Sequence, residues 1–140
     1  MLQKGERVFF ADNSKDDQAR CAVFARTTRD LGLVPVSYSG AGTAVRHSSL
    51  DREIRNDFYA ARAVVLYFGT PKEGSSHGDH WVLREIRHVA SAGVPCLVYV
   101  SEDFPKEILV NHGYQNEPKV TSEADFGAAL GRDLASLIIS

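Results

Sequence analysis

The chain has 140 residues, of which 44% are hydrophobic and 24% are charged, and its formal net charge is −2. This composition suits one globular domain, so we expect residues 1–140 to form a single domain, either alone or at the front of a longer receptor. No basic stripe marks a nucleic-acid surface, and no apolar run is long enough to span a bilayer. The charged start and the two unpatterned cysteines favour a cytoplasmic protein.

Short apolar segments alternate with amphipathic ones in the first half of the chain. Asn13 and Ser14 are expected to form a loop and a helix cap, with Asp17 in the capping-box position. The pattern predicts a strand at residues 6–12, a helix at residues 15–31, an edge strand with Pro35 at residues 33–38, a helix with Phe58 on its apolar face, and a strand at residues 63–68.

The second half repeats this alternation. A glycine-rich loop begins at Gly69, and Ser122 is expected to cap the last helix, which has Phe126, Leu130 and Leu134 on its buried face. Between them the pattern predicts a helix at residues 79–92, a strand at residues 94–100, a short helix at residues 106–110 and a short strand at residues 119–121.

Strands that alternate with helices predict an α/β fold with a parallel sheet. We expect a flavodoxin-like, three-layer domain with a four- to five-stranded parallel sheet in the order 2-1-3-4-5. Ligands bind such sheets at the carboxyl ends of the strands where the winding reverses, between the first and third strands. This rule selects the loops that follow Asp12 and Gly69.

Several familiar chemistries fit the sequence poorly. The strand at residues 63–68 ends without the acid of a receiver domain, and Ser75 replaces the lysine of a phosphate-binding loop after Gly69 and Gly74. The histidines between residues 77 and 88 match no zinc spacing, so no metal is expected. No nucleophile elbow around a serine is present.

Trp81 and Glu85 are the strongest candidates for chemistry. Residues four apart share one helix face, so an indole and a carboxylate stand together beside the predicted crevice. The plain alternative is that Trp81 is a half-buried side chain that anchors the helix and that Glu85 is a solvated acid. The apolar face of this helix is predicted at Val82, Ile86 and Val89, so the core does not need the pair.

Three segments, RVFFADNSKDD, AVVLYFGT and HWVLREI, carry a family resemblance. With them, the chain resembles a TIR (Toll/interleukin-1 receptor) domain of the bacterial NAD-cleaving kind, and a TIR-related family of uncharacterised bacterial domains found before signalling NTPases. The resemblance implies that Glu85 is catalytic, that Trp81 walls the pocket, and that NAD is a substrate and not a cofactor. It also implies bacterial immune signalling and activation by self-association through the loop from Ser39 to Ser48.

The segment from Glu85 to Pro95 is also similar to the glutamate-containing segment of nucleoside deoxyribosyltransferases, which also cut a base from a sugar. Ordinary glycoside hydrolysis uses two carboxylates, but the nicotinamide of NAD is already cationic and leaves without being protonated. One carboxylate, Glu85, can then offset the developing charge on the ribose. Both likenesses therefore imply cleavage of an N-glycosidic bond.

The sequence suggests further substrate contacts around that pair. Phe10 or Tyr38 is expected to stack on nicotinamide, the N–H groups near Asn13 and Ser14 to bind the diphosphate, and Arg46 to offer a second positive charge. Ala11 lies in the same first-strand motif and completes the expected substrate-binding set. The products are nicotinamide and either ADP-ribose or a cyclic form. The two rival hypotheses are a non-catalytic TIR-like adaptor and a deoxyribosyltransferase-like enzyme.

Overall fold

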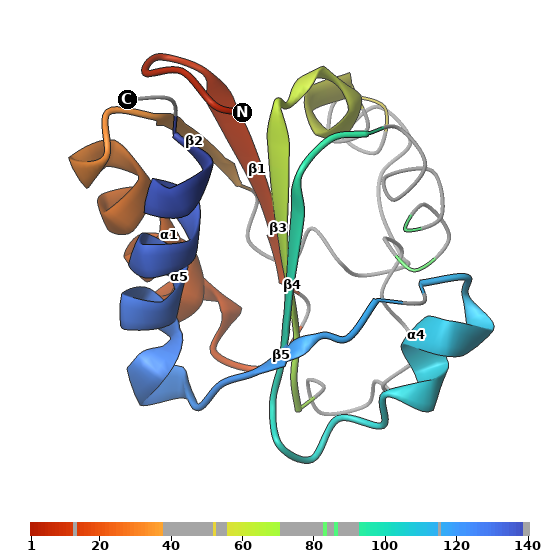
Figure 1. The fold of residues 1–140 in the computed structure, drawn as a ribbon. Helices are drawn as coiled ribbons and strands as arrows, with labels where there is room; N and C mark the ends of the chain where they lie inside the picture. Colours follow the sequence, from red (N-terminus) through yellow and green to blue (C-terminus); the bar gives the residue numbers. More distant parts are fainter. Residues whose placement is uncertain are drawn as a thin grey trace.

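The computed structural model describes residues 1–12, 14–37, 52, 56–70, 83, 86, 93–114 and 116–138. At its centre is a five-stranded parallel sheet with the order β2-β1-β3-β4-β5 (Figure 1). The strands are β1 (Arg7–Asp12), β2 (Val34–Ser37), β3 (Ala63–Phe68), β4 (Cys96–Val100) and β5 (Lys119–Val120). This order confirms the predicted α/β, flavodoxin-like fold.

Helices cover both faces of the sheet. α1 (Asp17–Asp30) and α5 (Glu123–Leu137) lie side by side on one face, and α4 (Glu107–Asn111) lies on the other (Figure 1). Residues 56–60 of the predicted second helix are helical and lie on the same side as α4. Among the described helices, none is long and apolar enough to cross a membrane.

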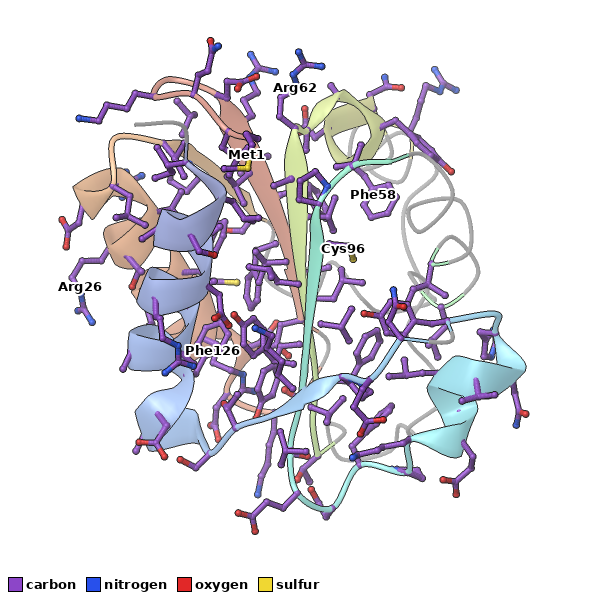
Figure 2. All side chains as sticks on the ribbon, viewed as in Figure 1. Met1, Arg26, Phe58, Arg62, Cys96 and Phe126 are labelled. Atoms are coloured by element: carbon purple, nitrogen blue, oxygen red, sulfur yellow. The ribbon has the colours of Figure 1, made fainter. Side chains whose placement is uncertain are left out.

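The core consists of two apolar layers, one on each face of the sheet. Phe10 packs toward α1 and α5 with Phe126, whereas Phe9 packs on the opposite face with Phe58. Figure 2 shows Phe126 and Phe58 on the two sides of the sheet. Because successive residues of a strand point to opposite faces, a central strand covered on both sides reads as continuous apolar sequence. Accordingly, every residue of β3 is buried.

The predicted helix at residues 79–92 is described at Leu83 and Ile86. Both side chains are buried in the layer that contains Phe9. Ile86 confirms one position of the predicted apolar face, and Leu83 is a buried residue that the predicted face did not include. The remaining residues of this segment lie outside the described part of the chain.

The start of α1 differs from the prediction. The helix begins at Asp17, and its N-cap residue is Asp16, whose φ is 64° and whose side chain makes no capping hydrogen bond. Ser14 does not cap the helix, because its hydroxyl group is bonded within the polar cluster described below. In α5, by contrast, Ser122 is the N-cap as predicted, and its Oγ accepts a hydrogen bond from the N–H of Asp125 at 3.3 Å.

Candidate functional site

The carboxyl ends of β1, β3 and β4 lie at one edge of the sheet, the lower edge in Figure 1, where the sequence predicts the site. Asp12 ends β1, and its side chain is 0% exposed. Its Oδ1 accepts two hydrogen bonds from Ser14, one from the N–H at 2.8 Å and one from the hydroxyl at 2.6 Å. Asp12 therefore fixes the start of the loop between β1 and α1.

Arg20, near the start of α1, brings a buried positive charge to this loop. Its Nε donates to Oδ2 of Asp12, and its Nη2 donates to Oγ of Ser14 and to the main-chain oxygen of Lys15. The guanidinium carbon lies 4.4 Å from the centroid of the Tyr67 ring, within the range of a cation–π interaction. These contacts join β1, β3 and α1 through one buried side chain.

Burial has the largest effect on the carboxyl group of Asp12 and raises its pKa. The Arg20 guanidinium and the two Ser14 donors act in the opposite direction. We assign the carboxylate form to Asp12, because donors from both residues point at its two oxygens and one of them carries a full positive charge.

Gly69 follows β3 and lies against this cluster. A Cβ atom at this position would come 2.7 Å from Cε1 of Tyr67 and 3.3 Å from Cβ of Ser14. A side chain at this position would have to displace the Tyr67 ring of β3 and would press on Ser14 in the loop after β1. The close approach of these two segments explains why the position is occupied by glycine.

The three described residues that were predicted to bind substrate are all buried. The Phe10 ring is 0% exposed and stacks on the Phe24 ring, with 4.9 Å between the ring centroids. This ring belongs to the core, so the prediction that it stacks on nicotinamide is corrected. Ala11 is 0% exposed and Ser14 is 1% exposed. Since both faces of β1 are covered, Phe10 and Ala11 fill the two apolar layers.

Of the N–H groups near Asn13 and Ser14 that were expected to bind the diphosphate, that of Ser14 is already bonded, and Asn13 lies outside the described residues. The N–H of Ser14 donates to Asp12, and the N–H of Lys15 donates to the main-chain oxygen of Thr70 at 2.9 Å. The acidic residues at the start of α1, Asp16 and Asp17, add negative charge where a phosphate would need positive potential. A bound diphosphate would have to replace existing hydrogen bonds and approach like charges.

The other predicted site residues lie outside the described residues. They are Asn13, Tyr38, Arg46, Trp81 and Glu85, together with the loop from Ser39 to Ser48. Of the predicted site, the structure therefore brings together Ser14 and the end of the first strand. The placement of the Trp81–Glu85 pair therefore stays a prediction from the sequence.

Sequence reasoning missed Arg20 and Asp103 as parts of this edge. Arg20 lies four residues before Phe24 on the same face of α1, and both are buried, so helical spacing was a usable indication. Asp103 follows β4 and accepts a hydrogen bond from the Ser101 hydroxyl at 2.6 Å. Asp103 lies near the end of β3 because β3 and β4 pair side by side. Local sequence patterns do not show which strands pair.

A hollow of about 420 Å³ lies at the far end of the same edge, where β5 and the start of α5 meet the end of β4. Its lining includes Tyr99, Lys119, Ser122 and Arg132. Positive and negative side chains both border it, because Glu102 also contributes to the lining. This mixed lining defines no single class of ligand.

The two cysteines do not provide a reactive thiolate. Burial raises the pKa of Cys21 to about 11 and that of Cys96 to about 12. Both thiols therefore remain protonated at neutral pH. Within the described residues, no group of three or more histidine, cysteine, aspartate or glutamate side chains is placed to hold a metal ion.

Comparison of the sequence with models of known protein families and with curated proteins finds no match. The family resemblance consequently rests on the quoted sequence motifs. The structure itself shows the class of fold, which is α/β and flavodoxin-like with a parallel five-stranded sheet.

Proposed function

We propose that this chain is an NAD+ nucleosidase that breaks the bond between nicotinamide and ribose. The observation that carries the proposal is the Trp81–Glu85 pair, which follows β3 in a sheet whose winding reverses between β1 and β3. Packing of Leu83 and Ile86 in the core supports it, because these aliphatic side chains anchor the segment that carries the pair.

Glu85 is the carboxylate on which this mechanism depends. The bond between C1′ of the ribose and the nicotinamide nitrogen breaks, and its electron pair passes to the ring, which leaves neutral. Glu85 offsets the positive charge that develops on the ribose, while Trp81 shields the pocket. Water then forms a bond to C1′ and loses a proton to give ADP-ribose, or an adenine nitrogen attacks to give a cyclic product.

The test is release of nicotinamide from NAD by concentrated, self-associating protein. We expect Glu85→Gln to lower the rate by about 100-fold or more, because the neutral amide cannot offset the ribose charge. Glu107→Gln, which neutralises an exposed carboxylate in α4, is the matched control and should cleave at the wild-type rate. Cleavage by Glu85→Gln at that same rate would rule out the mechanism.

The burial of Phe10, Ala11 and Ser14 favours a second candidate, a non-catalytic TIR-like adaptor that assembles through the loop from Ser39 to Ser48. An adaptor would self-associate and release no nicotinamide under the same conditions. Deoxynucleosides offered alongside NAD would identify a deoxyribosyltransferase-like enzyme, which would exchange bases between the nucleosides. One incubation therefore separates the three functions.

A further inference from the structure

We propose that Asp103, in the connection from β4 to α4, is a positioning residue for the reaction at Glu85. This inference rests on the proposed function, since a positioning residue needs a reaction to serve. It concerns Thr70, through which the chain leaves β3 and enters the loop that leads to Trp81 and Glu85.

Thr70 is held from two sides. Its main-chain oxygen accepts a hydrogen bond from the N–H of Lys15 at 2.9 Å, which ties it to the loop after β1. Its hydroxyl donates to Oδ2 of Asp103 at 3.3 Å, which ties it to the loop after β4. The other carboxylate oxygen of Asp103 accepts the hydroxyl of Ser101 at 2.6 Å. Two hydroxyl groups from different loops thus orient one carboxylate.

These bonds continue into the buried cluster. The main-chain oxygen of Lys15, whose N–H holds Thr70, accepts from Arg20. On the other side, the N–H of Ser101 donates to the main-chain oxygen of Phe68 at 3.0 Å. A connected set of hydrogen bonds therefore runs from α1 across the ends of β1, β3 and β4, and Thr70 lies in the middle.

The two ends of this set differ in exposure. Arg20 is buried, whereas Asp103 is exposed to solvent, so loss of the Asp103 carboxylate should leave the core intact. Its effect should fall on the placement of Thr70 and on the loop that begins there. Because a shift of about 1 Å in a reacting group can cost about 100-fold in rate, a loosened loop base lowers turnover.

The first measurement is steady-state NAD cleavage. Asp103→Ala is expected to lower kcat by about tenfold with a change in KM below about threefold, because the loss concerns geometry in the transition state. Asp103→Asn keeps one oxygen acceptor and should recover part of kcat. Glu102→Gln, which alters the preceding exposed carboxylate, is the control and should keep wild-type kinetics.

The second measurement does not depend on activity. Hydrogen exchange at the Lys15 amide reports whether Thr70 is held, since that amide donates to Thr70. Exchange should become faster in Asp103→Ala and in Thr70→Val, and adding Thr70→Val to Asp103→Ala should change it little, because the bond between these two side chains is already lost.

The outcomes separate the two ideas. Unchanged exchange at Lys15 in Asp103→Ala overturns the inference, whether or not the protein cleaves NAD. Equal kcat in the wild-type protein and Asp103→Ala overturns the role of Asp103 and leaves the proposed function standing. A wild-type protein that cleaves no NAD overturns the proposed function, and the role of Asp103 in the reaction with it.

Discussion

Two aspartates join a helix to the sheet, and they do so in different surroundings. Asp12, at the end of β1, is 0% exposed and meets Arg20 of α1 in the interior. Asp133 of α5 is 8% exposed and accepts a hydrogen bond from the Tyr99 hydroxyl at 2.7 Å. It also forms an ion pair with Lys119 at 2.9 Å. The first contact is sealed from water, while the second reaches the surface.

The pKa values of the two carboxyl groups move in opposite directions. Burial is the largest single influence on each carboxyl group and acts to raise its pKa. For Asp12 burial prevails, but for Asp133 the donors Tyr99 and Lys119 together outweigh burial and lower the pKa. The buried pair should therefore be sensitive to loss of a partner, and the Asp133 network should be sensitive to acid.

The largest effect is expected from Arg20→Met. The substitution leaves Asp12 buried without its cation, and we expect a loss of about 3–5 kcal/mol in the free energy of unfolding. Urea denaturation followed by circular dichroism measures this loss. Arg26→Met is the control, because Arg26 is exposed on the same helix and points away from the sheet (Figure 2).

A double variant sharpens this test. Adding Asp12→Asn to Arg20→Met removes the unpaired charge and should recover part of the lost stability. Equal stability of Arg20→Met and Arg26→Met would show that the pair contributes nothing and would remove the contrast between the two aspartates.

Glycine substitutions should give smaller effects of opposite sign in the two regions. Gly69→Ala places a Cβ atom 2.7 Å from the Tyr67 ring, so we expect a loss of about 1–3 kcal/mol. Gly131→Ala in α5 meets Thr27 at an ordinary 3.5 Å and should stabilise the helix by about 0.5–1 kcal/mol. Thermal unfolding of both variants tests these two expectations. A stabilising Gly69→Ala would contradict the tight packing beside Asp12.

The smallest loss of stability is expected from Tyr99→Phe. Loss of the hydrogen bond to Asp133 should cost about 1 kcal/mol at neutral pH. Because the folded pKa of Asp133 is lowered from 3.8, its contribution is present above pH 3.8 and is lost as the pH falls through the lower folded value. The variant should therefore lose less stability on acidification below that pH than the wild-type protein does.

Unfolding measured across this acid range checks the prediction. Tyr59→Phe is the matched control, since Tyr59 is 57% exposed and should keep the wild-type pH profile. Identical acid profiles for Tyr99→Phe and the wild-type protein would mean that Tyr99 does not set the pKa of Asp133.

The fold could be predicted from the sequence because its causes are local. The continuous apolar run at residues 63–68 needs cover on both faces, and it forms β3 with the predicted bounds. Ser122 followed by Asp125 marks the start of α5 by a capping pattern within one turn. Pro35 restricts its strand to an edge, and β2 is an edge strand.

The described part of the site could not be predicted in the same way. Alternation shows that Phe9 and Phe10 point to opposite faces of β1, but it does not show which side chains of the covering elements meet them. An arginine on a helix reads as a surface residue, whereas Arg20 is buried because Asp12 and Tyr67 meet it from two strands. These contacts depend on tertiary packing and leave only weak traces in the local pattern.

The outer edges of the described sheet are poor templates for adding a further strand. Val34 directs its N–H toward β1, where it bonds the Glu6 oxygen at 2.9 Å, so the nitrogen of Pro35 faces the open side and carries no hydrogen to offer. At the far side, β5 presents only two residues. Between two copies of the domain, the described sheet edges can therefore form few hydrogen bonds, which lowers the tendency to pair edge to edge.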